Sequence, residues 1–265
     1  MRPLIRYARL YRVFLENCFV REAEFRANFW ANLFTNTGWL FFYVLFIKVI
    51  YLNTRRIGNW TEAEAMVLTG TFGVIQGLFN IIAYQNVSQL PDMIRLGTLD
   101  FVVTRPVNAY FMAATRYVKL DSLGNVAGAA LVTAYGISLT HAVPPFSGVA
   151  AYLFLCLCAL LIYFGSYMLL MTLAFWLVRV ENLAVLTDTV FSVGRYPIDV
   201  FRGWGRTLFT YLIPVAFVAS FPARALFGKA PASWLWAGAV IAGVLLWASV
   251  RFWSFGLRNY SSAGS

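Results

Sequence analysis

Residues 149–178 read VAAYLFLCLCALLIYFGSYMLLMTLAFWLV, and this stretch decides the class of fold. It contains no Asp, Glu, Lys or Arg, and a helix of about 20 apolar residues already crosses the hydrocarbon core of a bilayer. The whole chain shares this character. Of its 265 residues 60% are hydrophobic and 12% are charged, whereas soluble domains have about 45–50% and about 25%. The composition therefore predicts an all-α protein that spans a membrane.

Six stretches have the length and apolarity that a crossing requires, and we expect a six-span bundle. The predicted spans are 29–52, 65–87, 122–139, 149–178, 208–221 and 234–255. The fifth is the shortest and contains Pro214. This prediction divides the chain into an N-terminal segment 1–28, a membrane domain 29–255 with cytoplasmic loops 88–121 and 179–207, and a cytoplasmic tail 256–265.

The distribution of basic residues predicts the orientation. Sixteen of the 21 Lys and Arg residues fall in the N-terminal segment, the two long loops and the C-terminal part from Arg251 onward. The other five fall in the remaining loops and at the end of the first span. Because basic loops stay in the cytoplasm, we expect both termini there, in an inner (cytoplasmic) membrane protein. The basic residues are spread between apolar runs, so no nucleic-acid surface is expected.

The N-terminal segment has the pattern of a basic amphipathic helix. Arg2, Arg6, Arg9 and Arg12 recur at steps of three and four residues, and apolar side chains occupy another face. Such a helix lies in the interface of a bilayer. The alternative is a helix in water that touches no lipid.

The first long loop contains a short helix signal. Residues 90–97 read LPDMIRLG, in which Pro91 suits a helix start and Gly97 a helix end. This helix either docks a cytoplasmic partner or only turns the chain back toward the membrane, and the spacing does not choose between the two.

Polar and small side chains interrupt the second span. The polar ones are Gln76, Asn80, Tyr84, Gln85 and Asn86. They either line a transport pathway or bond to neighbouring helices. Gly73 and Gly77 form a small-residue pair that allows helices to approach closely, inside the subunit or between two subunits.

The chemistry that the chain lacks is equally informative. His141 is the sole histidine, the three cysteines have no metal-ligand spacing, and only Lys229 follows a glycine, without the Ser or Thr that completes a phosphate-binding loop. We expect no catalytic residues, no metal site and no ATP site in this chain. A lipid-modifying membrane enzyme and an ATP-independent channel or scaffold subunit remain as alternatives.

Several short motifs carry a family resemblance. They are IRLGTLD at 94–100, TRPV at 104–107, RYPI at 195–198, IPVAF at 213–217 and FPA at 221–223. In their order around the spans the chain resembles permease subunits of the type-2 ABC exporter superfamily, in its branch of compact six-span bacterial permeases.

The resemblance implies a function and partners. The chain would be the permease of an ABC transporter, with ATP and magnesium bound by a separate nucleotide-binding ATPase subunit and with a second identical or related permease beside it. The second and fifth spans would line the pathway. The loop helix would be the coupling helix, and the residues so assigned are Asp92, Met93, Ile94, Arg95, Leu96, Gly97 and Asp100. The transported molecule is not implied. The direction of transport is undecided, although export is what the family mostly does, and we expect an exporter.

Overall fold

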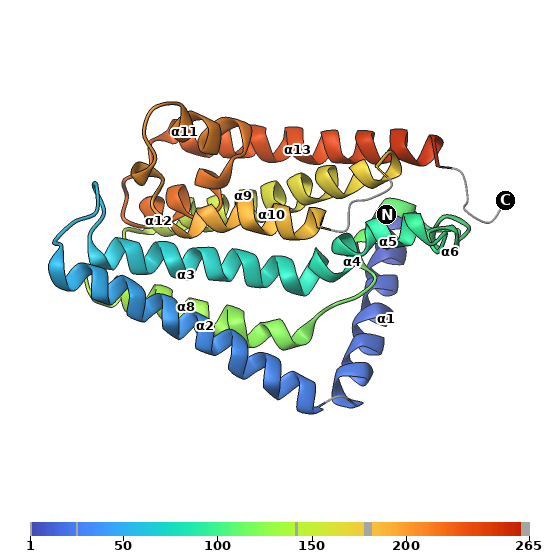
Figure 1. Cartoon of the computed structure of the whole chain (residues 1–265), viewed down its shortest axis with the longest axis horizontal. Helices are drawn as coiled ribbons and strands as arrows, with labels where there is room; N and C mark the ends of the chain where they lie inside the picture. Colours follow the sequence, from blue (N-terminus) through green and yellow to red (C-terminus); the bar gives the residue numbers. More distant parts are fainter. Residues whose placement is uncertain (1, 25, 141–142, 178–181, 261–265) are drawn as a thin grey trace.

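The computed structural model describes residues 2–24, 26–140, 143–177 and 182–260. These residues form a bundle of helices without a β-strand, and Ile57 and Trp60 make one isolated β-bridge. Figure 1 shows the long helices side by side along one direction, with α1 set steeply against one end. We call this the α5 end, because α5 lies there, and the other the α12 end.

The described α-helices have the following bounds: α1 Arg2–Glu24, α2 Arg26–Asn53, α3 Glu62–Phe79, α4 Gln85–Ser88, α5 Leu90–Arg95, α6 Asp100–Val103, α7 Ala109–Thr115, α8 Leu123–Ser138, α9 Phe146–Thr172, α10 Leu183–Ser192, α11 Trp204–Thr207, α12 Ser220–Leu226 and α13 Ala232–Arg258. Two π-helices, Asn80–Tyr84 and Leu208–Leu212, follow α3 and α11. Turns of 3₁₀-helix occupy Leu120–Ser122, Leu173–Phe175, Val193–Arg195, Ile198–Val200 and Val215–Phe217.

Glycines bring α3 and α8 into close contact. A Cβ added at Gly70 would lie 2.7 Å from the carbonyl oxygen of Ala129, and one at Gly73 would lie 2.8 Å from the Ala129 Cβ. A Cβ at Gly77 would meet the Val126 side chain at 2.7 Å. The small-residue pair Gly73 and Gly77 therefore packs inside the subunit, where it lets two backbones approach.

Three helices are long and apolar enough to cross a membrane, and a fourth crossing is counted if one bent pair is a single span. The three are Glu62–Arg95, Phe146–Phe175 and Ala232–Arg258, and they contain the predicted spans 65–87, 149–178 (up to Phe175) and 234–255. Two other predicted spans, 29–52 and 122–139, fall almost entirely within α2 and α8. Over the described residues, these two helices are not both long enough and apolar enough to count as crossings, so the six-span count stays a prediction.

The structure differs from the sequence-based division at the predicted fifth span, 208–221. The chain here forms two helical pieces, Trp204–Leu212 and Val215–Leu226, and its direction bends by 68° between them. Asp199, just before the first piece, forms an ion pair with Arg224 in the second, so the pair starts and finishes at the α12 end. Pro214 at the bend removes a backbone donor, which explains why the helix breaks there. We read this segment as a re-entrant hairpin.

The segment from α10 to Val200 runs the length of the bundle instead. Near its start, Asp188 contacts Tyr84, which lies toward the α5 end of the long helix Glu62–Arg95. Near its finish, Asp199 accepts a hydrogen bond of 2.9 Å from the indole of Trp60, just before α3. The expectation that loop 179–207 lies wholly on the side opposite residues 53–64 is therefore wrong for its second half. The helix α10 has ten residues and carries Asp188, so its sequence alone is too short and too polar to predict a span.

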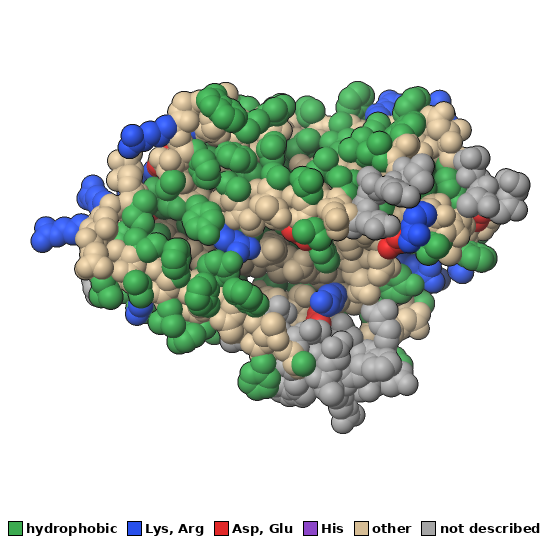
Figure 2. Space-filling view, in the orientation of Figure 1, with side chains coloured by type: hydrophobic (Ala, Val, Ile, Leu, Met, Phe, Trp, Pro, Cys, Tyr) green, Lys and Arg blue, Asp and Glu red, His purple; other side chains and the backbone are tan. Residues whose placement is uncertain are grey.

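The N-terminal helix α1 packs on the α5 end. Arg6 donates a hydrogen bond of 2.8 Å to the carbonyl oxygen of Pro106, and the rings of Tyr7 and Phe111 meet edge to face at 5.0 Å. Cys18 is buried against Val118. Figure 2 shows apolar side chains over much of the visible face of the molecule. The position of α1 in a bilayer interface stays a prediction.

Candidate functional site

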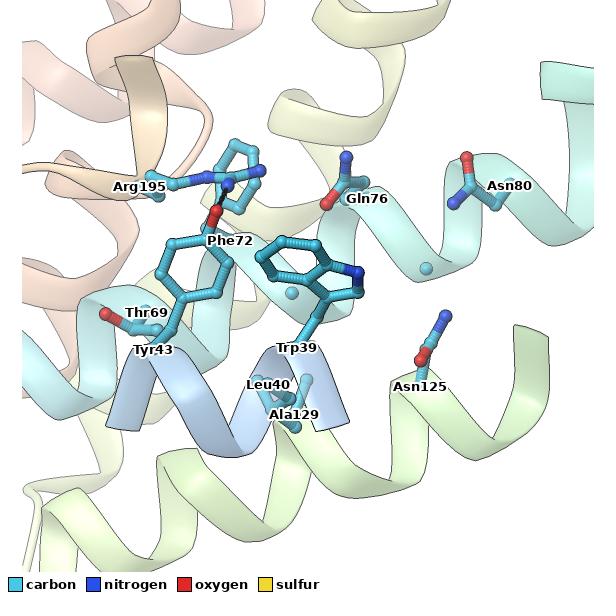
Figure 3. Close-up of a pocket in the computed structure, with 12 residues that line it drawn as sticks. Trp39, Leu40, Tyr43, Thr69, Phe72, Gln76, Asn80, Asn125, Ala129 and Arg195 are labelled. Atoms are coloured by element: carbon cyan, nitrogen blue, oxygen red, sulfur yellow. Dashed lines mark hydrogen bonds between the residues drawn. The ribbon is translucent and has the colours of Figure 1, made fainter. Parts of the chain in front are cut away.

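A groove of about 230 Å³ lies where α2, α3 and α8 meet the turn that follows α10 (Figure 3). Its polar lining side chains are Thr69, Gln76, Asn80, Asn125 and Arg195. Its aromatic lining side chains are Trp39, Tyr43 and Phe72. The groove therefore combines one cation, three amides and three rings inside an otherwise apolar bundle.

Helical spacing places the amides together. Thr69, Phe72, Gln76 and Asn80 follow one another at steps of three and four residues, which puts them on one face of α3 and its extension. The π-helix begins at Asn80, and such widened turns are frequent at functional sites. Asn125, on α8, faces the same space from below in Figure 3.

Arg195 supplies the positive charge of the groove. It sits in the 3₁₀ turn after α10, donates a hydrogen bond to the Tyr43 hydroxyl, and lies with its guanidinium carbon 4.5 Å from the centroid of that ring and 5.1 Å from that of Phe72. Its Nε is buried and has no hydrogen-bond partner in the described part of the chain. No described carboxylate lies within ion-pair distance of it, so ring faces, which attract cations, are its main electrostatic partners.

The residues that the sequence suggested for a pathway separate into two groups. Gln76 and Asn80 line the groove. Tyr84 donates a hydrogen bond of 3.0 Å to Asp188, and Asn86 is buried, with its amide bonded to both the N–H and the C=O of Tyr117 at 2.7 Å. Gln85, between them, is half-buried and does not line the groove.

Asp188 is a polar centre that the sequence did not reveal. It accepts hydrogen bonds from Tyr84 and, at 3.3 Å, from Tyr167, and the rings of Phe79 and Tyr163 surround the two tyrosines. Two phenol donors compensate a carboxylate that is removed from water. This cluster joins α10 to the π-helix after α3 and to α9.

The predicted coupling residues lie together at the α5 end. Pro91 occupies the first turn of α5, and Gly97 follows the helix with a φ of +72°, a conformation that glycine adopts without strain. Met93 and Ile94 pack against the core, whereas Asp92 and Arg95 form an exposed ion pair of 3.0 Å.

The exposed surface beside this helix is partly apolar. The Leu96 side chain is 62% exposed, and Phe101 in α6 is also exposed. Asp100 lies beside Tyr260, and burial, followed by this carboxylate, raises the pKa of the Tyr260 hydroxyl. The C-terminal end of α13 is thus next to the loop that holds α5.

A charged clamp closes the α12 end. Asp199 accepts a hydrogen bond of 2.9 Å from Trp60 and pairs with Arg224 and, at 3.3 Å, with Arg206. The Arg224 guanidinium also lies over the Trp60 ring at 4.8 Å. The clamp ties the start of α3 to both pieces of the re-entrant hairpin.

A bundle of long apolar helices with a polar groove inside it defines the class of membrane-spanning proteins that hold a functional site between their helices. The comparison with protein families agrees with this class. Residues 37–264 match the family described as ABC-2 family transporter protein, and the chain belongs to that family. The resemblance to type-2 ABC permeases is confirmed. No curated protein matches the chain.

Proposed function

We propose that this chain is the exporter-type permease subunit of an ABC transporter in a bacterial cytoplasmic membrane. A separate ATPase subunit binds ATP and Mg²⁺, and a second identical or related permease completes the pathway. Residues 1–28 form the interfacial helix, residues 29–255 the membrane domain, and residues 256–265 a cytoplasmic tail.

One observation carries the proposal. The helix Glu62–Arg95 is continuous over 34 residues and joins the groove to the coupling helix. Gln76 and Asn80, in the middle of this helix, line the groove, and Arg95, its last residue, lies at the exposed surface. A push on α5 by an ATPase subunit would therefore be transmitted along this helical stretch to the side chains that face the groove.

The charge distribution supports cytoplasmic termini after the fold is taken into account. Arg202 and Arg206 move to the α12 end, Arg195 is inside the bundle, and Arg179 lies outside the described residues, so the count of basic residues changes from sixteen against five to twelve against seven. The α5 end keeps the excess and is the cytoplasmic end under the positive-inside rule. Six crossings then follow from α2, α3, α8, α9, α13 and the segment from α10 to Val200.

Co-purification with an ATPase subunit tests the proposal. The chain is tagged, purified from its native host in a mild detergent, and the accompanying proteins are identified by mass spectrometry. We expect an ATPase subunit in stoichiometric amount. The variant Arg95→Ala/Leu96→Ala removes one exposed cation and one exposed apolar side chain from the proposed docking surface. Losing the burial of one Leu costs about 1.5–3 kcal/mol, which weakens docking about tenfold to hundredfold.

The control variant is Arg12→Ala/Val13→Ala, which removes the same kinds of exposed side chain from α1. It should retain the ATPase subunit. If the Arg95→Ala/Leu96→Ala protein carries as much ATPase subunit as the control, α5 is not the docking element. If the wild-type chain purifies alone from several detergents, the permease assignment itself is wrong.

A further inference from the structure

We infer that the groove beside Arg195 binds the anionic head of an amphiphile, a single phosphate or carboxylate group attached to an apolar tail. This names the class of transported molecule, and it rests on the proposed function for the statement that the bound molecule is cargo. The geometry itself is independent of that statement.

The charge of Arg195 is the first argument. Four described arginines pair with carboxylates: Arg12 lies in α1, and Arg95, Arg206 and Arg224 lie at the two ends of the bundle. Arg195, inside the bundle, has no described carboxylate partner. A guanidinium inside a spanning bundle costs several kcal/mol unless something compensates it. Tyr43 and Phe72 offer ring faces and one hydroxyl but no negative charge. A planar fork of donors with an unsatisfied Nε is suited to a phosphate or carboxylate.

The unused hydrogen-bonding capacity of the groove is the second argument. Gln76, Asn80 and Asn125 line it and donate no hydrogen bond to any described residue. Thr69 Oγ1 and Arg195 Nε are two of the three buried side-chain atoms in the described structure that lack a partner. Buried polar atoms are nearly always bonded, so these two buried atoms mark a place where a ligand would supply partners, and the three half-buried amides beside them offer further donors and acceptors.

Size and surroundings indicate an amphiphile. The groove holds about 230 Å³, below the roughly 300–1,000 Å³ of pockets that enclose a drug-sized molecule. It therefore accommodates a headgroup and leaves the rest of the ligand outside. At its rim, Trp39 is 59% exposed and begins an exposed aromatic row that continues with Phe42 and Phe46 on α2. An apolar tail that leaves the groove would lie along this row.

A neutral or cationic ligand fits the same residues less well. A sugar would use the amides and rings but would leave the guanidinium without a counter-charge. A cation would meet Arg195 with no described carboxylate beside it. The like charge alone would oppose its binding.

Equilibrium binding to the purified full chain tests this inference. The chain in alkyl-maltoside micelles is titrated calorimetrically with dodecyl phosphate, with dodecyltrimethylammonium and with inorganic phosphate. We expect saturable binding of dodecyl phosphate alone. Arg195→Gln should weaken it at least tenfold, and Arg195→Lys, which keeps the charge but loses the fork, should weaken it less. Arg202→Gln removes an exposed arginine seven residues further on and should leave binding unchanged.

The outcomes separate the parts of the inference. Equal affinity in Arg195→Gln, or equal binding of the alkylammonium, overturns the anion site. Binding of inorganic phosphate as tight as that of dodecyl phosphate overturns the amphiphile. If Arg195→Gln aggregates in gel filtration, Asn80→Leu replaces it, and unchanged affinity in that folded variant refutes the site. No ATPase enters this titration, so its failure is distinguishable from failure to co-purify an ATPase subunit.

Discussion

Replacing Asp199 by Asn should destabilise the protein far more than the same change at Asp92. The Asp199 side chain is 10% exposed and that of its partner Arg224 is 19% exposed, so their ion pair is largely removed from water. Removing one partner of a buried pair costs about 3–5 kcal/mol, because the remaining charge is left without compensation. Asn keeps an oxygen for the Trp60 indole, which reduces the expected loss to about 2–3 kcal/mol.

The control variant, Asp92→Asn, removes the same kind of ion pair at a site exposed to water. Asp92 pairs with Arg95 at 3.0 Å, and the two side chains are 62% and 50% exposed. Such pairs contribute about 1 kcal/mol or less. For a chain of this size each kcal/mol shifts the melting temperature by roughly 2–4 °C, so Asp199→Asn should lower it by about 5–10 °C and Asp92→Asn by less than about 4 °C.

Unfolding can be followed with a thiol-reactive fluorophore in detergent, because Cys18 and Cys158 are buried and become reactive when the bundle opens. The double variant Asp199→Asn/Arg224→Leu should recover part of the loss, since it removes the uncompensated cation as well. Equal melting temperatures for Asp199→Asn and Asp92→Asn would refute the reasoning. That result would mean that the clamp does not hold the α12 end together.

Two further predictions concern packing inside the bundle. Asn86→Leu removes the two hydrogen bonds that the Asn86 amide makes to the N–H and C=O of Tyr117 and should cost about 2–4 kcal/mol in the thermal assay. Gln85→Leu, at the half-buried neighbour, should cost less than about 1 kcal/mol, and equal losses would contradict the bonded role of Asn86. Gly70→Ala should lower the melting temperature by several degrees, because the added Cβ would collide with the backbone of α8. Gly243→Ala, where a Cβ would have nothing within 4 Å, should leave stability unchanged or raise it by up to about 1 kcal/mol. An unchanged melting temperature for Gly70→Ala would show that α3 and α8 are further apart.

The sequence predicted those helices whose formation depends only on residues close together in the chain. The run 149–178 falls almost entirely within one long helical stretch, Phe146–Phe175, because its composition alone favours burial in lipid. The short helix in the first loop spans Leu90–Arg95, with Pro91 in its first turn and Gly97 just after its end. Pro91 and Gly97 act through their own backbone conformations, so the sequence alone could place them. Neither prediction required a contact between distant residues.

The groove and the clamp could not be predicted, because they depend on distant contacts. Trp60 and Asp199 are 139 residues apart, and Arg195 and Tyr43 are 152 apart. A hydropathy window reads the stretch around Asp188 and Arg195 as a polar loop. In the structure two phenols of other helices donate hydrogen bonds to Asp188, and ring faces lie against Arg195, so this polar segment is buried within protein, where such segments are tolerated in a membrane domain.

The groove and the clamp are linked through one short segment. Arg195 and Asp199 are four residues apart, in two 3₁₀ turns separated by Pro197, whose ring fixes φ. The Ile198 N–H donates to the Ser220 hydroxyl at 3.3 Å, so the re-entrant hairpin also holds this segment. The clamp therefore sets the position of Arg195 from the α12 end, whereas Gln76 and Asn80 lie further along the helix Glu62–Arg95, which the clamp holds at its start and which reaches α5 at its other end. A displacement of α5 relative to the clamp changes the distance between the cation and the amides, which would change the affinity of the groove for an anionic head.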